Sequence, residues 1–157
     1  MQYKLAQINI AKMLAPIDSP VMAEFVANLD GINTLAEGSE GFVWRLKDEE
    51  NNATAIRVFD DDFIIVNMSV WENAEFLHRF VYGSMHVEIF KQRKKWFEQM
   101  KDMHMAMWYI PAGYTLTASD GVERLSYLRA NGETPYAFTY RSKFTAEDAV
   151  EYKNMAL

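Results

Sequence analysis

The chain has 157 residues, of which 50% are hydrophobic and 24% are charged, and this composition is typical of a single globular domain. Its formal net charge of −6 argues against nucleic acid as a partner, because binding to phosphates requires a basic surface. The absence of cysteine excludes disulfides, thiolate metal sites and cysteine nucleophiles. No apolar run approaches the roughly 20 residues of a membrane span, and no secretory signal is evident, so we expect a cytoplasmic protein that does not bind membranes.

Hydrophobic periodicity predicts the secondary structure along the chain. We expect four principal strands, over residues 3–12, 42–46, 63–71 and 103–110. We expect helices over residues 20–37, 74–82, 84–99 and 117–129, and a short fifth strand over 136–140. Residues 145–155 are expected to form either a weak terminal helix or a frayed tail. Residues 1–142 are therefore assigned to a single domain and residues 143–157 to a tail or short helix.

This order of elements predicts the fold. The pattern βαββαβ is that of a ferredoxin-like α+β fold, here followed by a C-terminal αβ extension. Right-handed crossovers place the first two helices on the same face of the antiparallel sheet. Because both faces of the strand from Phe63 to Trp71 are largely apolar, the other face also needs a cover. We expect the sheet of a second subunit to provide it, giving a homodimer described as a dimeric α+β barrel.

Several segments resemble a known family. They are LAQINIA, GFVWRL, VNMSVWE, FVYGSMH, the spaced Arg93, Trp96 and Phe97, and MWYIPAG followed by AFTY. Together they span about residues 4–140 and are similar to domain-of-unknown-function family 3291, a resemblance that implies the dimeric α+β barrel fold and brings no activity. The tail from Ser142 to Leu157 lies outside the resemblance. Tyr114 stands where the family has a histidine, so no role of that histidine is carried over.

Two residues of the helix predicted over residues 84–99 are candidates for catalysis. His86 and Arg93 are seven residues apart, which is two turns of one helix face. A histidine over the sheet is suited to act as a general base, a haem ligand or a hydrogen-bond donor to a ligand, and an arginine beside it is suited to hold a carboxylate or phenolate. The alternative is structural, with His86 bonded to a carbonyl group and Arg93 paired with Glu72 or Glu88.

Polar residues also occur within strands that we expect to be buried. Asn9, Asn67 and Ser69 are of this kind, and buried polar atoms need hydrogen-bond partners. A bound ligand would satisfy them, and so would contacts across a dimer interface. Arg45, within an apolar strand, needs a carboxylate partner, for which Asp30 or Glu72 is the structural choice and a substrate acid the functional one.

Aromatic residues are frequent, and they supply the remaining candidate ligand contacts. Four tryptophans lie on elements expected to converge, and aromatic walls with a few polar groups are typical of small-molecule pockets. The alternative is that each tryptophan only fills core volume. The candidate ligand-binding residues are Trp44, Asn67, Ser69, Trp71, Phe76, Tyr82, Trp96, Phe97 and Trp108. Asn9 is grouped with His86 and Arg93 as a catalytic candidate.

We expect no metal site and no cofactor. The three histidines lack close ligand spacing, and the sequence contains no phosphate-binding loop or nucleophile elbow. Haem is the alternative, because haem-degrading members of the wider superfamily use a strand asparagine, a helix tryptophan and a helix histidine. Asn9 and His86 would take the first and last of these roles. Phe76, ten residues before His86, replaces the tryptophan and weakens this reading.

Three functions are consistent with these observations. The first is an enzyme that resembles cofactor-independent monooxygenases and binds a small aromatic or apolar molecule between helices and sheet. In it, His86 or a pocket water would take a proton from a phenol-like substrate while Asn9 and Arg93 stabilise the anion. The second is a non-catalytic metabolite-binding protein with the same pocket. The third is a structural dimeric protein whose polar groups are all paired internally.

Overall fold

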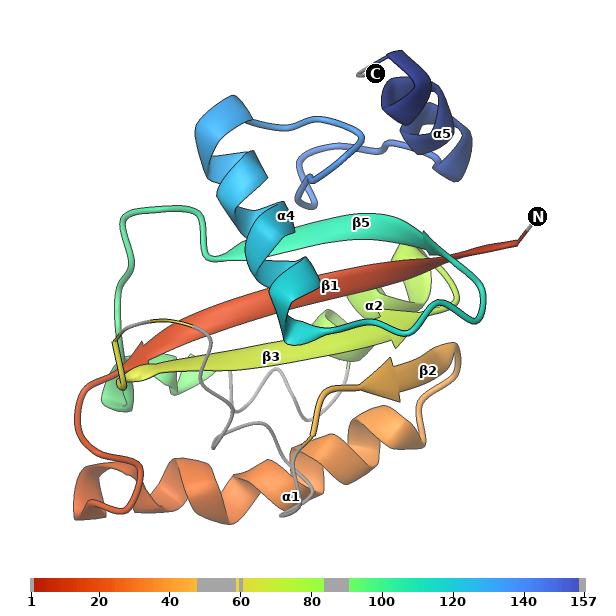
Figure 1. The fold of residues 1–157 in the computed structure, drawn as a ribbon. Helices are drawn as coiled ribbons and strands as arrows, with labels where there is room; N and C mark the ends of the chain where they lie inside the picture. Colours follow the sequence, from red (N-terminus) through yellow and green to blue (C-terminus); the bar gives the residue numbers. More distant parts are fainter. Residues whose placement is uncertain (1, 48–58, 60, 84–90, 156–157) are drawn as a thin grey trace.

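A computed structural model describes residues 2–47, 59, 61–83 and 91–155 of the chain. Within these residues, five antiparallel strands form one sheet (Figure 1): β1 (Tyr3–Met13), β2 (Phe42–Arg45), β3 (Ile64–Trp71), β4 (Phe97–Glu98) and β5 (Met105–Pro111). The long strand β1 is central, because it pairs with β3 along one side and with β4 and β5 along the other, while β2 pairs with β3. The predicted α+β class with a ferredoxin-like sheet is confirmed.

The helices that accompany this sheet follow the predicted order. They are the 3-10 turn η1 (Pro20–Met22), α1 (Ala23–Glu37), α2 (Ala74–Gly83), the 3-10 turn η2 (Arg93–Lys95), α4 (Ala118–Asn131) and α5 (Ala146–Met155). The terminal segment is thus a short helix, one of the two outcomes expected for it. No helix within the described ranges has both the length and the apolar character needed to cross a membrane.

One face of the sheet, called here the α4 face, is covered by the chain itself. Nine alternating side chains from three strands lie on it, all apolar and all at most 5% exposed: Ala6, Ile8, Ile10, Val66, Met68, Val70, Ala106, Trp108 and Ile110. They pack against Leu125 and Leu128 of α4, which crosses in front of β5, β1 and β3 in Figure 1. The expectation of a bare face awaiting a second subunit is therefore wrong, because the C-terminal extension supplies the cover.

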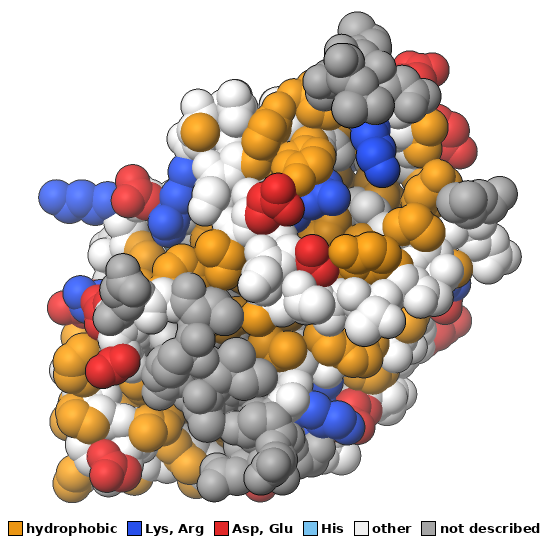
Figure 2. All heavy atoms as spheres, in the orientation of Figure 1, with side chains coloured by type: hydrophobic (Ala, Val, Ile, Leu, Met, Phe, Trp, Pro, Cys, Tyr) orange, Lys and Arg blue, Asp and Glu red, His pale blue; other side chains and the backbone are white. Residues whose placement is uncertain are grey.

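Helix α4 is built for this close contact. It begins with a capping box, in which the Thr117 hydroxyl accepts from the Asp120 N–H and the Asp120 carboxylate accepts from the Thr117 N–H. Gly121 follows on the sheet side, where an added Cβ would lie 2.8 Å from Cδ1 of Ile8 and 2.9 Å from the Met68 sulfur. The missing side chain lets the helix backbone approach the strands. From outside, the space-filling view shows hydrophobic, basic and acidic side chains interspersed over this side of the molecule (Figure 2).

The opposite face, called here the α1–α2 face, carries two separate apolar clusters. The first, named the α2 cluster, contains Leu5, Ala36, Trp71, Leu77, Met107 and Phe138. The second, named the α1 cluster, contains Met13, Met22 and Trp96. Leu5 and Met13 stand near opposite ends of β1, so the two clusters lie at opposite ends of the sheet. The middle of this face lies between them.

Two predicted segments differ from the structure. The helix expected over residues 84–99 does not reach its predicted end, because Arg93–Lys95 form a 3-10 turn and Phe97–Glu98 pair with Lys12 and Met13 as β4. Burial of Trp96 in the α1 cluster and this strand pairing outweigh the helical pattern. The strand expected over 136–140 is reduced to isolated bridges, in which Phe138 exchanges hydrogen bonds of 2.7 and 3.0 Å with Met107.

Candidate functional site

Four polar side chains occupy the middle of the α1–α2 face. Gln7 and Asn9 of β1 stand opposite Ser69 and Asn67 of β3 as paired residues of the antiparallel ladder. These four residues are called the polar strip. Because side chains alternate along a strand, all four project from the same face, and they separate the α2 cluster from the α1 cluster.

Some polar groups of the polar strip have hydrogen-bond partners within the protein. Nε2 of Gln7 donates to Oδ1 of Asn67 and to Oγ of Ser69, both at 2.8 Å, and Nε1 of the buried Trp71 donates to the same hydroxyl at 2.9 Å. Gln7 and Ser69 are only 5% and 8% exposed. A hydroxyl that accepts two bonds keeps its own hydrogen as a donor. The buried half of the strip is therefore a fixed network.

The other half of the polar strip is open. The side chains of Asn9 and Asn67 are exposed, and within the described part of the chain Asn9 makes no side-chain hydrogen bond. Each carboxamide offers two donor hydrogens and an acceptor oxygen. Side by side on paired strands, the two amides can hold a ligand that carries an oxygen or a hydroxyl group, while Gln7 and Ser69 keep Asn67 in place.

A small pocket of about 70 Å³ opens beside the polar strip, between α1 and strands β2 and β3. Its lining comprises Phe25, Leu29, Asn33, Arg45, Leu46, Ile65, Val66 and Asn67. Pockets for drug-sized ligands have roughly 300–1,000 Å³, so this pocket has room for a small group of atoms only. Asn67 belongs to both the pocket and the polar strip and connects them.

Arg45 lines this pocket and is 6% exposed. Its Nε donates to Oε1 of Glu37, at the end of α1, over 2.9 Å. The sequence suggested Asp30 or Glu72 as the partner, and that assignment is wrong, because Glu72 pairs with Lys4 instead. An ion pair fixes the arginine, as expected for a charge removed from water.

The catalytic candidates are not all brought together. Asn9 lies in the polar strip, opposite Asn67. Arg93 lies in η2 with its side chain exposed, rather than on a continuous helix face shared with residue 86. His86 lies outside the described residues, so its predicted role stays a prediction.

The four tryptophans do not converge. Trp108 is buried in the core of the α4 face and Trp44 packs against that core, whereas Trp71 and Trp96 belong to the two separate clusters of the opposite face. Their expected common aromatic wall is wrong. Strand parity is the physical reason, because Trp44 pairs with Val70 and Trp108 with Ala6, and both partners face α4. Of the four, Trp71 contacts the polar strip directly.

The remaining aromatic candidates lie toward the two ends of the α1–α2 face. Phe97 packs edge-on against Phe25, with ring centroids 5.0 Å apart, at the α1 end. Phe76 is half-buried, and its ring occupies the space that a side chain at Gly41 would need. Tyr82 is 54% exposed, and its ring is tilted against that of His78 with the ring centroids 4.6 Å apart. Phe76 and Tyr82 thus border the α2 end of the face.

Tyr140 joins this aromatic group from the C-terminal extension. Its ring lies 5.7 Å from that of His78 and 6.1 Å from that of Tyr82. Burial, with a further contribution from Tyr82, raises the pKa of the Tyr140 phenol far above its usual value. The phenol therefore stays protonated, and it serves as a fixed wall rather than as a base.

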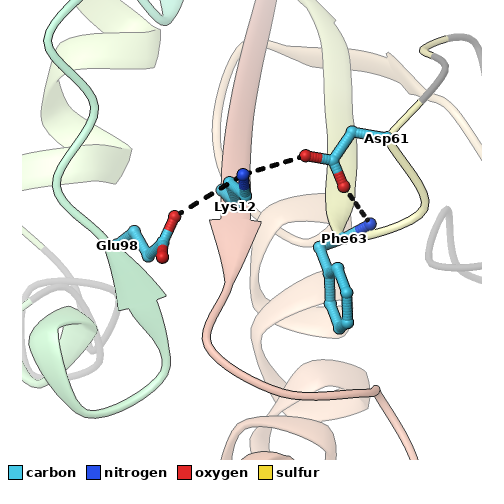
Figure 3. Close-up of polar contacts among 4 residues, drawn as sticks. All are labelled: Lys12, Asp61, Phe63 and Glu98. Carbon is cyan, nitrogen blue, oxygen red and sulfur yellow. Dashed lines mark hydrogen bonds and ion pairs between the residues drawn. The ribbon is translucent and has the colours of Figure 1, made fainter.

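Charged residues gather where β1 ends (Figure 3). Lys12 lies between Asp61 and Glu98, with its Nζ 3.0 Å and 3.8 Å from their carboxylate oxygens. The Asp61 carboxylate also accepts from the Phe63 N–H at 2.9 Å. That backbone bond, followed by the bond from Lys12, lowers the pKa of Asp61, and the Asp61 bond raises the pKa of Lys12.

Sequence reasoning missed Gln7, Asn33 and the pocket role of Arg45. Gln7 shares strand parity with Asn9, and this signal was available from the alternation alone. Asn33 stands four residues after Leu29 on α1, so helical spacing places the two side chains on the same face, and this signal was also available from the sequence. No group of three or more His, Cys, Asp or Glu side chains suited to a metal ion occurs among the residues that the structure describes.

The sheet, its helices on both faces and the polar strip define a ferredoxin-like α+β protein with a candidate ligand site under α1 and α2. A family model described as "Domain of unknown function (DUF3291)" matches residues 4–154. The chain belongs to this family. The match also covers most of the tail that the sequence resemblance left out.

Solved structures with similar folds share little sequence with this chain. A mutant of SnoaB, a cofactor-independent oxygenase from Streptomyces nogalater, is 15% identical with a TM-score of 0.47, over 72% of this chain and 96% of that one. A protein of unknown function from Nitrosomonas europaea is 12% identical with a TM-score of 0.45, over 74% and 97%. A Pseudomonas aeruginosa protein is 12% identical with a TM-score of 0.47, over 74% and 98%. A search of curated proteins finds no match.

Proposed function

We propose that this protein binds a small aromatic or apolar molecule on the α1–α2 face, with the polar strip as its hydrogen-bonding floor. The observation that carries the proposal is the pair of exposed amides, Asn9 and Asn67, in the middle of a sheet face that is apolar at both ends. A face buried under two helices gains stability from apolar side chains. Polar groups placed there at the expense of apolar ones, as Asn9 and Asn67 are, are typical of functional sites.

The same site supports a monooxygenase-like enzyme that needs no cofactor. Asn9 and Asn67 would hold the oxygen atom of a phenol-like substrate, and their N–H donors would stabilise the anion formed when its proton leaves. His86 or a pocket water would accept that proton, and Arg93 would add positive charge. Dioxygen would be the oxidant and would take four electrons from the deprotonated substrate. One oxygen atom would become a ring carbonyl oxygen, and the other would leave as water with the hydroxyl proton and the hydrogen lost from the ring carbon. We propose a cytoplasmic location, with which the absence of cysteine is compatible.

The test uses 1-naphthol as a fluorescent probe. Asn9→Ala removes an exposed amide with no internal hydrogen bond, so we expect the fold to lose less than about 0.5 kcal/mol. The affinity for the probe should fall about fivefold or more, because a hydrogen bond to the ligand is lost. Asn131→Ala, at the end of α4 on the opposite side of the sheet, is the matched control and should bind as the wild type does. Equal affinities in all three proteins would overturn the proposal.

Turnover separates the enzyme from a non-catalytic binding protein. His86→Ala should abolish oxygen consumption with a phenolic substrate if the protein is an enzyme, and should change only affinity if it is a binding protein. The internal hydrogen bonds of the Gln7–Ser69–Trp71 network specifically favour the third candidate, a structural protein, for which no probe would bind. Mass spectrometry of freshly purified protein, under native and denaturing conditions, would reveal a co-purified ligand.

We also propose a homodimer, with an interface that differs from the one predicted from the sequence. The sheet-to-sheet contact predicted from sequence required an open apolar face, and α4 covers that face. A dimer would then use other exposed apolar residues, such as Leu14 and Val21 near the start of α1, which are 47% and 51% exposed. Native mass spectrometry at micromolar concentration should give twice the chain mass, and a strictly monomeric mass would contradict the proposal.

A further inference from the structure

The C-terminal extension forms a second hollow, between helix α5 and the segment that connects it to α4. Figure 1 shows α5 beyond β5, at the edge of the sheet opposite β2. The hollow, called here the α5 groove, is open to solvent and has a volume of about 260 Å³. It is lined by Pro135, Phe144, Asp148, Glu151 and Tyr152. None of these residues belongs to the polar strip, so the α5 groove is a separate candidate site.

We propose that the α5 groove binds a small organic amine in its protonated form. The proposal goes beyond the function of the polar strip and rests on two carboxylates and two aromatic residues that line one hollow. Carboxylates form charge-assisted hydrogen bonds with an ammonium group, and the faces of aromatic rings attract it as well. The volume lies just below the roughly 300–1,000 Å³ of sites for drug-sized ligands, which suits an amine that carries a single ring.

The carboxylates of the α5 groove are available to a ligand. Oδ2 of Asp148 accepts from the Thr145 N–H at 2.8 Å, and Oδ1 accepts no hydrogen bond from the described residues. Glu151 is exposed, and its side chain makes no hydrogen bond or ion pair within the part of the chain that the structure describes. Among the described residues, no lysine or arginine lines the groove. A bound cation would therefore meet two negative charges that no basic residue of the lining neutralises.

A neighbouring tyrosine shows the effect of this negative charge. Tyr109 of β5 is half-buried, and its hydroxyl donates to the Phe144 carbonyl at 2.8 Å. Its pKa is raised by burial first, and then by the charges of Asp148 and Glu147. The carboxylates of α5 thus disfavour another negative charge beside the groove, and by the same Coulomb interaction they favour a positive one.

The aromatic residues of the α5 groove are held by contacts outside it. The ring of Phe144 packs against that of Phe138, with the centroids 5.6 Å apart, and Phe138 is only 2% exposed. The hydroxyl of Tyr152 is hydrogen-bonded to that of Tyr127 on α4. Because these side chains are already ordered, binding a ligand between them costs little conformational entropy.

A matched pair of probes tests the proposal by heteronuclear NMR titration of the full chain. 2-Phenylethylamine is protonated near neutral pH, as lysine is, and 2-phenylethanol has the same ring and length without the charge. We expect the wild-type protein to bind the amine about tenfold more tightly than the alcohol. The largest shifts of backbone amides should occur at residues 144–152. Equal affinity for the two probes, or shifts confined to other parts of the chain, would overturn the proposal.

Glu151→Gln removes one charge from the α5 groove and keeps the size of the side chain. Because Glu151 is exposed and makes no internal contact of its carboxylate, the fold should be unchanged. Affinity for the amine should fall about threefold, as expected for an ion pair near solvent. Affinity for the alcohol should change by less than about 1.5-fold, because a neutral head group does not form that ion pair.

Glu147→Gln is the matched control. It removes the same charge from the first turn of α5, at an exposed residue outside the lining of the groove. Both probes should bind this variant as they bind the wild type. Equal losses of amine affinity in Glu147→Gln and Glu151→Gln would show that the overall charge of α5 attracts the amine, and would overturn the groove as a site. Naphthol binding at the polar strip should be unchanged in both variants.

Discussion

The two faces of the sheet are built in different ways. On the α4 face, nine strand side chains are apolar and nearly inaccessible. On the α1–α2 face, the same strands carry apolar residues at their ends and the polar strip in their middle. Burial of apolar area stabilises the fold by about 25 cal/mol per Å², so the middle of the second face gives up stabilisation that the first face retains. The α4 face therefore contributes more to stability, and the α1–α2 face carries the proposed ligand site.

The largest expected effect concerns the α4 face. Leu125→Ala removes a side chain that is 1% exposed and packed against the sheet, and such substitutions typically cost about 2–4 kcal/mol because a cavity remains. The loss in the free energy of unfolding can be measured by urea denaturation. Binding of 1-naphthol should be unchanged, because α4 lies on the other side of the sheet from the polar strip.

Leu35→Ala is the matched control for this substitution. Leu35 is half-buried on α1, so its truncation exposes less new apolar surface and should cost less than about 2 kcal/mol. Equal losses in the two variants would show that the faces do not differ in their contribution to stability. A loss of naphthol binding in Leu125→Ala at a temperature where it remains folded would contradict the division of roles.

The architecture was predictable because its signals are local. The apolar run predicted as a strand over residues 63–71 is observed as β3, and the first helix, predicted to begin at residue 20, begins there with η1. The helix predicted over residues 117–129 is also observed, as α4. The surface against which α4 packs was not predicted, because the apolar residues of an amphipathic helix show that the helix packs against something and do not show against what. For that reason, the expectation that one face of the sheet is left bare for a second subunit was wrong.

The second prediction concerns the buried half of the polar strip. Ser69→Ala removes the acceptor for Nε1 of Trp71 and for one bond from Nε2 of Gln7. Trp71 is 1% exposed, so its N–H would be left without a partner away from water, at a cost of about 1–3 kcal/mol. Thermal and urea unfolding should report this loss. Naphthol affinity should fall as well, since the network positions Asn67.

Ser39→Ala serves as the control for a lost hydroxyl. Ser39 donates to the Leu35 carbonyl in a half-buried setting at the end of α1, where water can replace the bond, so the expected cost is below about 1 kcal/mol. If Ser69→Ala were no more harmful than Ser39→Ala, the polar strip would not be a fixed network. The two exposed amides would then lack the support that preorganises them.

The candidate site was only partly predictable for a related reason. Asn9, Asn67 and Ser69 were identified as polar residues in strands, and register brings them together because all three share one parity. Trp44 and Trp108 were placed with them because their elements were expected to converge, but the alternation of side chains along the strands puts both on the α4 face. Arg93 was assigned to a helix face, but it lies in the 3-10 turn η2. Pairing register and helix ends depend on contacts distant in sequence, so single-sequence patterns leave them open.

The smallest expected effect lies at the rim of the sheet, outside both faces, at Asp61 (Figure 3). The Phe63 N–H and Lys12 lower the pKa of Asp61 below 3.8 in the folded protein. The unfolded chain therefore takes up this proton first, so the contribution of Asp61 to stability is present above about pH 3.8 and disappears as the pH falls through the folded pKa. In Asp61→Asn, the free energy of unfolding should fall less steeply as the pH is lowered, and naphthol binding should be unchanged. Asp62→Asn, at an exposed neighbouring position, is the control and should keep the wild-type dependence on pH. A full acid limb in Asp61→Asn would mean that carboxylates elsewhere in the chain dominate acid unfolding, and a loss of ligand binding would mean that the rim is coupled to the polar strip rather than separate from it.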